Sequence, residues 1–285
     1  MSLFSNWNGK VVKNEEIHIS PDNRSFRYGD GFFETIKVID GRILLQDFHF
    51  QRLFSSLEVL KFSIPPFFTK RFVEDQIISL VKFNKQEEIA RVRLTVFSGN
   101  GGLYDLEDRH LNFIIQSLPG NISSNYYNTA GLKTDIFLNA KKSADVFSPI
   151  KSNNYLGYAM GAIWAKEHEL DDCLLTNSFN RIADATIANV FVVTDGIIKT
   201  PLLSEGCVNG VMRRYLLACL QKESFEHVET QIAVEELRTA TEIFLTNATY
   251  GIRWVQSIGK NNYNNSLSSL LHKKFIEPLF ASSTF

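Results

Sequence analysis

Short runs of β-branched and aromatic residues, separated by glycine turns, constrain the fold more than any other feature of this sequence. The pairs Asn8-Gly9, Asp40-Gly41 and Asp195-Gly196 each stand between two such runs. An Asn-Gly or Asp-Gly pair in that position is the strongest short-range sign of a β-hairpin. We therefore expect strands joined as hairpins in both halves of the chain.

Helical patterns lie between these strands. Asp47 is expected to cap a helix, and apolar residues recur on one face of it at helical spacing. The residues of that face are Phe50, Leu53, Phe54, Leu57 and Leu60. Further helices are expected over 70–83, 153–168, 211–222 and 267–280, and further strands over 89–98, 111–116, 132–138, 173–176, 242–246 and 252–258. Strands with interspersed helices predict the α+β class.

An uncharged stretch rich in Pro, Gly, Ser and Asn, from Ser117 to Thr129, is the best candidate for a linker. A chain of 285 residues with 44% hydrophobic residues can bury one large core or two moderate ones. We expect a smaller N-terminal domain over 1–118, a linker over 119–128 and a larger C-terminal domain over 129–285.

Charge and composition exclude several kinds of partner. Thirty Lys and Arg residues balance 31 Asp and Glu residues, so no broad field attracts nucleic acid or an anionic membrane. The three cysteines and six histidines are scattered and predict neither a disulfide framework nor a metal site. No secretory signal and no apolar run near the ~20 residues that span a bilayer is visible. We expect a reduced, cytoplasmic compartment.

Lys151 is the strongest candidate for chemistry. It stands between apolar Ile150 and the helix expected from Asn153. One interpretation is a solvated lysine ahead of a helix, and the other is an amine that forms a Schiff base with a carbonyl cofactor. The local sequence leaves both open.

Three further features could bind a phosphate. Gly206 to Arg213 opens a helix with glycine and asparagine, so its first N–H groups could bind an anion, although a well-capped helix is an equal alternative. The strand end Leu245–Thr249 is small and polar, as many loops without a ligand are. Arg52 lies on the polar side of its helix, as a surface arginine or as a charge-assisted phosphate ligand.

Asp184 lies among apolar residues, where a carboxylate is costly to bury without a partner. A protonated ring nitrogen is one possible partner, and Arg181 or a backbone cap is the alternative. A lysine for an aldehyde, a cradle for a phosphate and an acid for a ring nitrogen are the parts that pyridoxal 5'-phosphate (PLP) requires, because its protonated ring withdraws electrons from a substrate carbanion.

Several segments in chain order carry a family resemblance: Tyr28–Thr35, His49–Leu53, Arg91–Arg93, Lys151–Leu156, Asp184–Phe191, Gly210–Arg213 and Thr246–Ala248. Together they resemble the fold-type IV PLP enzymes, the class-IV aminotransferase family. That family includes branched-chain and D-amino-acid aminotransferases and 4-amino-4-deoxychorismate lyase. The resemblance implies a two-domain α+β chain, with a smaller N-terminal α/β domain and a larger C-terminal β-barrel-like domain that carries helices and the cofactor lysine. It also implies a cofactor between the domains and a homodimer whose partner chain completes the substrate pocket.

The same resemblance implies roles for individual residues. Lys151 forms the internal aldimine with PLP and moves the proton between Cα and the C4′ carbon. Asp184 stands where the family has a longer Glu beside the pyridine nitrogen. The remaining cofactor-binding residues are Arg52, Tyr155, Val211, Met212, Asn247 and Ala248.

The reaction is less constrained than the cofactor. Thr35 follows the Phe-Glu pair where branched-chain aminotransferases usually have Gly, and Trp254 stands where most of the family has Pro. We expect an aminotransferase acting on an amino acid and a 2-oxo acid, with Tyr28, Phe33 and Arg91 as candidates for substrate contact. One alternative is aminodeoxychorismate lyase, in which the Thr35 hydroxyl would be a proton donor rather than an ordinary strand residue. The other is an inactive binding or scaffold protein.

Overall fold

The computed structural model describes residues 3–105 and 110–281 and divides into two compact units. Unit 1 contains the chain up to Ser123 together with Ile150–Asn154. Unit 2 contains Ser124–Pro149 and Tyr155–Ala281. Each unit is described by itself.

Unit 1 is built on an antiparallel sheet with the strand order β2-β1-β6-β5-β3-β4. The predicted alternation over β5 is confirmed, because Val92, Leu94 and Val96 are buried while Arg91 and Arg93 are exposed. The strands are β1 (Phe4–Trp7), β2 (Lys10–Lys13), β3 (Phe32–Ile39), β4 (Arg42–Ile43), β5 (Ile89–Phe97) and β6 (Asn112–Pro119).

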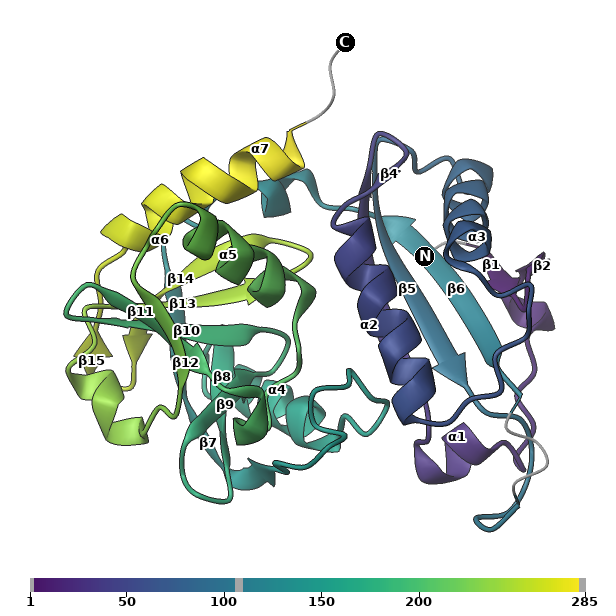
Figure 1. Cartoon of the computed structure of the whole chain (residues 1–285), viewed down its shortest axis with the longest axis horizontal. Helices are drawn as coiled ribbons and strands as arrows, with labels where there is room; N and C mark the ends of the chain where they lie inside the picture. Colours follow the sequence, from purple (N-terminus) through teal and green to yellow (C-terminus); the bar gives the residue numbers. More distant parts are fainter. Residues whose placement is uncertain (1–2, 106–109, 282–285) are drawn as a thin grey trace. The chain divides into compact units, whose positions relative to one another are not determined.

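Two long helices cover the buried face of this sheet. Helix α2 (Gln46–Val59) packs on β3, and α3 (Lys70–Phe83) packs on β6 and β1 (Figure 1). Their apolar residues, such as Leu53 and Ile77, join strand residues such as Val92 in one core. The short α1 (Arg24–Tyr28) precedes β3.

Unit 2 is a closed barrel of six strands. The strands follow one another in the order β7-β8-β9-β10-β13-β14, and β14 pairs again with β7. The pairs β7–β8 and β14–β7 are parallel, and the other pairs are antiparallel. The barrel strands are β7 (Leu132–Lys142), β8 (Asp172–Asn177), β9 (Ile182–Ala185), β10 (Asn189–Thr194), β13 (Glu242–Asn247) and β14 (Gly251–Ile258). The predicted α+β class and the β-barrel-like C-terminal part are confirmed.

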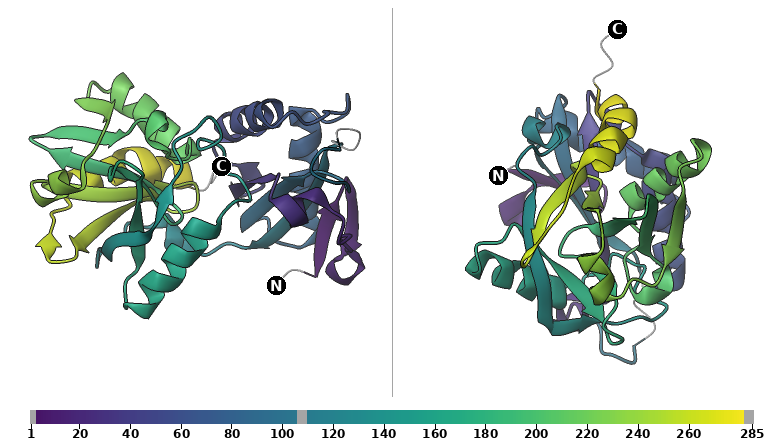
Figure 2. Two further views of the ribbon diagram at one scale, coloured as in Figure 1. Left: turned by 90° about the horizontal axis from the view of Figure 1, so that it is seen from below. Right: turned by 90° about the vertical axis from the view of Figure 1, so that its left-hand side faces the viewer.

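The remaining elements of unit 2 surround the barrel, as Figure 2 shows from two further sides. Strands β11 (Ile197–Pro201), β12 (His227–Thr230) and β15 (Asn261–Asn262) extend the sheet. The helices are α4 (Leu156–Glu167) on β7 and β8, α5 (Val211–Lys222) on β13 and β12, α6 (Ser266–Leu271) on β13 and β14, and α7 (Glu277–Phe280). Short 3-10 helices of unit 2 cover Leu203–Glu205 and Val234–Arg238, and a π-helical turn covers His272–Ile276. A 3-10 helix of unit 1 covers Asn14–Glu16, and another, Ile122–Asn125, spans the boundary between the two units.

Several predicted boundaries differ from the structure. Helix α3 begins and ends at the predicted residues, but α2 begins at Gln46 with Leu45 as its N-cap, so the expected cap by Asp47 is wrong. Helix α4 begins at Leu156 rather than Asn153, because the Asn153 N–H donates to a backbone carbonyl of unit 1. The helix predicted over 267–280 is present from Ser266 to Phe280, with a π-helical turn over His272–Ile276 just before Pro278, which has no N–H for the α-helical ladder. Elements of four or five residues, namely α1, β9 and β12, were missed because so few residues show no periodicity.

The segment Ile150–Asn154 belongs to unit 1, whereas the sequence placed Lys151 in the C-terminal domain. The physical reason is a short antiparallel contact with the start of β3. The Phe33 N–H donates to the Lys151 carbonyl at 2.9 Å, the Asn153 N–H donates to the Gly31 carbonyl at 2.8 Å, and Phe32 pairs with Ser152.

Candidate functional site

Lys151 has a fixed backbone and a side chain that contacts an aromatic ring. Its own carbonyl makes one of the two hydrogen bonds to the start of β3, and the N–H of Asn153 makes the other. Its Nζ lies 4.8 Å from the centre of the Phe33 ring, and the Arg93 guanidinium carbon lies 3.6 Å from the same centre. Phe33 is buried although the charged groups of Lys151 and Arg93 lie next to its ring. The structure thus places the candidate lysine and an arginine around one ring.

Two glycines allow the segment of Lys151 to approach the turn before β3. A Cβ on Gly31 would lie 2.4 Å from the Val96 carbonyl oxygen and 2.5 Å from the Asn153 side-chain nitrogen. Gly29 has φ +69°, and a Cβ there would lie 2.4 Å from the Asn154 side-chain oxygen. Larger residues at either position would displace the segment that carries Lys151.

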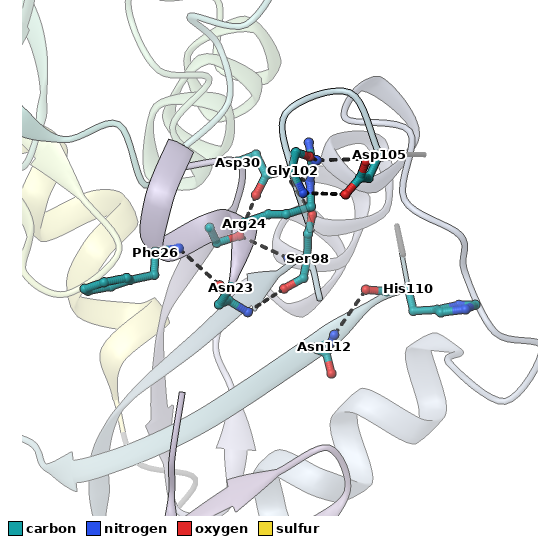
Figure 3. A network of polar contacts seen from close by, with 10 residues as sticks. Asn23, Arg24, Phe26, Asp30, Ser98, Gly102, Asp105, His110 and Asn112 are labelled. Carbon is teal, nitrogen blue, oxygen red and sulfur yellow. Dashed lines mark hydrogen bonds and ion pairs between the residues drawn. The ribbon is translucent and has the colours of Figure 1, made fainter. Parts of the chain in front are cut away.

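Asp30, between these glycines, anchors the turn to the rest of unit 1 (Figure 3). Its carboxylate accepts hydrogen bonds from Arg24 Nε at 3.0 Å, Ser25 Oγ at 2.8 Å and Ser98 Oγ at 3.2 Å. Arg24 is buried and also donates to the Gly102 carbonyl. The turn, the start of α1 and the end of β5 are therefore held together by one polar network.

The substrate candidates occupy different places in unit 1. Tyr28 is half-buried at the end of α1. Thr35 lies on the same face of β3 as Phe33, directly opposite Arg93 in the β3–β5 register. Arg91 lies two residues from Arg93, opposite Lys37. Arg93, which the sequence analysis did not select, is therefore closer than Arg91 to the ring that Lys151 contacts; the predicted alternation of β5 already placed both arginines on one face.

Arg52 is buried, so its expected position on the polar side of α2 is wrong. Its guanidinium donates to both oxygens of Glu34, at 2.7 Å and 2.6 Å, and His49 lies 2.7 Å from the same carboxylate. Burial raises the pKa of Glu34, but Arg52 and then His49 outweigh burial and lower it to about 2. The Glu34 carboxylate thus holds Arg52 in a fixed orientation.

Asp184 on β9 is buried in unit 2 and accepts three hydrogen bonds. The donors are the Tyr158 hydroxyl at 2.7 Å, the Val208 N–H at 3.0 Å and the Asn189 side-chain amide at 2.9 Å. Burial, and then the Asp184 carboxylate, raise the pKa of Tyr158 well above its ordinary value of 10, so this phenol stays a donor. Arg181, the other partner considered, pairs with Glu205 instead.

The N-terminus of α5 lies beside Asp184 and its hydrogen-bond donors. Gly210 is the N-cap, and no side chain caps the helix there. A Cβ on Gly210 would lie 1.8 Å from the Asn189 side-chain oxygen, so only glycine fits. Val211 and Met212 are buried in the first turn, where backbone N–H groups have no intrahelical acceptor. Such a turn suits an anion.

The other predicted cofactor residues of unit 2 surround the same strands. Tyr155 stacks on Tyr158 with ring centres 4.3 Å apart and donates to the Thr186 carbonyl. Asn247 ends β13, and Ala248 follows in a turn, half-buried. The Asn247 side-chain oxygen accepts from the N–H groups of Thr249 and Tyr250, at 2.9 Å and 3.0 Å, and so shapes this turn.

A family model for "Amino-transferase class IV" matches residues 31–258. This match spans most of the chain. The protein belongs to the class-IV amino-transferase family. The match confirms the predicted family, whose members are enzymes.

Two curated relatives show the breadth of this class-IV family. A putative branched-chain-amino-acid aminotransferase of Methanocaldococcus jannaschii is 28% identical over 95% of this chain and 93% of its own. An aminodeoxychorismate lyase of Bacillus subtilis is also 28% identical, over 95% of this chain and 94% of its own. The share of identical residues is thus the same for a putative transaminase and for a lyase.

Solved class-IV structures share the fold. A branched-chain aminotransferase from Thermoproteus uzoniensis, solved with norvaline, has a TM-score of 0.89 and 19% identity and covers 100% of this chain and 97% of its own. A branched-chain aminotransferase from Thermobaculum terrenum, solved in its PLP form, has a TM-score of 0.84 and 21% identity, with coverage of 98% and 94%.

Other kinds of site are not visible in the described part of this class-IV chain. Over residues 3–105 and 110–281, no group of His, Cys, Asp and Glu is arranged to hold a metal ion, and no helix is long and apolar enough to cross a membrane. Cys173, Cys207 and Cys219 are free. A cytoplasmic location stays a prediction.

Sequence reasoning missed Tyr158, Asn189 and Val208, which contact Asp184. Asn189 lies within the segment Asp184–Phe191, and Tyr158 lies two residues after the segment Lys151–Leu156. Their positions were therefore a weak signal that they belong to the site. The N–H of Val208 could not be found from residue type, because it is a backbone group.

Proposed function

We propose that this protein is a PLP-dependent amino-acid aminotransferase that transfers an amino group to a 2-oxo acid. The residues present fit the cofactor. A lysine has a fixed backbone, a buried carboxylate is surrounded by donors, and a helix N-terminus lacks a side-chain cap. When bound, PLP supplies an electron-withdrawing ring that makes the substrate Cα proton removable.

In this proposal the residues of unit 2 hold the cofactor. The carboxylate of Asp184 faces the ring nitrogen, and Tyr158, Asn189 and Val208 keep that carboxylate in place. The N–H groups of Val211 and Met212 bind the phosphate, and the turn at Asn247 and Ala248 closes its other side. Tyr155 packs against Tyr158 and orders this part of the site.

The residues of unit 1 provide the reactive amine and the cations. Lys151 links to the cofactor through its amine and moves the proton at the substrate Cα. Arg52, held by Glu34, adds a charge-assisted contact to the phosphate. Tyr28, Phe33 and Arg91 remain the proposed substrate contacts, and the position of Arg93 over Phe33 adds it as a candidate for the substrate carboxylate.

The short segment from Pro149 to Lys151 supports a shared role for these residues. Lys151 follows Pro149 by two residues, and the Pro149 carbonyl accepts a hydrogen bond from the Asn209 N–H at 2.9 Å, next to the N-cap of α5. Two trans peptide units span at most about 7.6 Å between Cα atoms. The covalent chain therefore limits how far the Lys151 backbone can lie from Pro149.

The fixed placement of Lys151 carries the proposal, and reduction with borohydride tests it. Protein loaded with PLP should be yellow, and borohydride should attach the cofactor to the peptide that contains Lys151, as detected by mass spectrometry. Lys151→Ala should show neither signal. Lys141→Ala, a control in which the lost amine is bonded to Thr176, should keep both. A colourless wild-type protein that takes up no added PLP would instead indicate an inactive member of the fold.

The lyase alternative is supported by Thr35. Its hydroxyl lies on the face of β3 that carries Phe33, whose ring contacts Lys151. A hydroxyl in that position could donate a proton to the eliminated enolpyruvyl group. Aminodeoxychorismate as substrate would then yield aminobenzoate and pyruvate, with Thr35→Val much slower than Thr35→Ser. Exchange of amino groups between amino acids and 2-oxo acids, without these products, supports the aminotransferase.

We also propose a homodimer. Helix α4 exposes an apolar stripe at helical spacing: Leu156, Met160 and Ile163 are 74%, 46% and 50% exposed. Such a stripe on a soluble helix is typical of a protein contact. A second copy presents the same uncharged stripe, so the contact is self-complementary under two-fold symmetry.

A further inference from the structure

Thr246 on β13 carries a buried hydroxyl that the structure does not satisfy. The residue is 1% exposed, and among residues 3–105 and 110–281 its Oγ1 has no hydrogen-bond partner. Buried polar atoms in native proteins are nearly always paired, and an exception indicates an ion, a water or a ligand group. The hydroxyl therefore calls for an explanation.

Strand register places this hydroxyl beside the start of α5. Thr246 pairs with Asn189, and two residues along the same strands Phe244 stacks on Phe191 with ring centres 5.0 Å apart. Residues two apart share a sheet face, and paired side chains lie about 5 Å apart. The side chain of Asn189 touches the N-cap Gly210. Thr246 is thus one side chain away from the first turn of α5.

The first turn of α5 has N–H groups but no hydroxyl of its own. The side chains of its first two residues, Val211 and Met212, are apolar, and Arg213 pairs with Glu229. The neighbouring amide of Asn247 is already used, because its oxygen accepts two backbone N–H groups and its nitrogen donates to the Ile187 carbonyl at 3.3 Å. Thr246 is a nearby side chain with a hydrogen bond to give.

We infer that the Thr246 hydroxyl donates a hydrogen bond to the phosphate group bound at the N-terminus of α5. This inference rests on the proposed function, and it adds a ligand that the family resemblance did not indicate. The bound phosphate monoester pairs the buried hydroxyl, and the hydroxyl adds a side-chain donor to the backbone N–H groups of Val211 and Met212 and to the proposed contact from Arg52.

Binding of PLP and of pyridoxal, which lacks the phosphate, tests this role in the full chain stripped of cofactor. Thr246→Val keeps the shape and removes the hydroxyl, so PLP affinity should fall roughly tenfold or more while pyridoxal affinity stays unchanged. Thr246→Ser should recover most of the PLP affinity. The ³¹P resonance of bound PLP should shift in Thr246→Val and return toward the wild-type position in Thr246→Ser.

A matched control comes from the neighbouring strand. Thr194 on β10 also has a buried Oγ1 without a partner in the described residues, but it lies five residues along the strand from Asn189. Five residues correspond to about 17 Å. Thr194→Val should leave the affinities for PLP and pyridoxal and the ³¹P resonance unchanged.

The outcomes separate the inference from the function on which it rests. Unchanged PLP affinity in Thr246→Val, or an equal loss for PLP and pyridoxal, overturns the role of Thr246 while the proposed function stands. A wild-type chain that binds PLP no better than pyridoxal overturns the phosphate site and this inference together.

Discussion

Replacing Glu34 by Gln should destabilise unit 1 in a manner that depends on pH. The carboxylate is buried between Arg52 and His49, and its pKa falls from 4.5 to about 2 on folding. A fall of this size corresponds to about 3 kcal/mol of stability at neutral pH. An independent figure agrees, since removing one member of a buried ion pair costs about 3–5 kcal/mol.

The sign of the pH dependence follows from the direction of this shift. A carboxyl whose pKa is lowered by folding adds its full stability above its unfolded value of 4.5. That stability is lost as the pH falls from about 5 toward 2. The difference between wild type and Glu34→Gln should therefore be about 3 kcal/mol at pH 7 and shrink steadily below pH 5.

Urea unfolding at a series of pH values measures this difference, and hydrogen exchange of peptides from β3 and α2 localises it to unit 1. Glu58→Gln, an exposed change on α2, is the matched control and should behave as wild type. Equal unfolding of wild type and Glu34→Gln at pH 7 would refute the reasoning. So would a difference that persists undiminished at pH 3.

Three further predictions concern unit 2. Asp184→Asn should keep the cofactor, because Asn can still accept hydrogen bonds, but should lose most turnover; unchanged turnover would remove Asp184 from the ring nitrogen. Ile163→Glu on the α4 stripe should give a monomer in light scattering, whereas Lys82→Glu, an exposed change on α3, should not. Gly210→Ala should lower the melting temperature and PLP affinity, because its Cβ would meet the Asn189 side chain at 1.8 Å; wild-type values for both would contradict this.

Local pattern was enough to predict the class of the fold and most of its long elements. The alternation of β5 and the periodicity of α3 are properties of neighbouring residues, and both are confirmed. The contact that fixes Lys151 joins residues more than 100 positions apart through backbone atoms. No local pattern encodes such a contact, so the sequence extended α4 over Asn153.

Motif order predicted the family, but residue type alone did not predict the neighbours of each candidate. Asp184 was identified as a buried carboxylate in need of a partner, and the structure provides three donors. One donor is the backbone N–H of Val208, which every residue except proline would offer. Its position depends on the loop before α5, and that loop is held by long-range contacts such as the hydrogen bond from Asn209 to Pro149.

The Glu34–Arg52 pair shows that one hidden interaction did leave a signal in the sequence. Glu34 stands in phase with Phe32, Ile36 and Val38, so strand alternation alone turns its carboxylate toward the core. Arg52 is buried beside Leu53 on α2 although the helical period of the sequence placed it on the polar side, and its cation offsets the desolvation of the carboxylate. A charged residue in the buried phase of a strand therefore predicts an internal partner of opposite charge, but it does not say which residue supplies that charge. The pair joins two of the segments that carry the family resemblance, Tyr28–Thr35 and His49–Leu53. We therefore predict that Glu34 orients Arg52 before any phosphate binds.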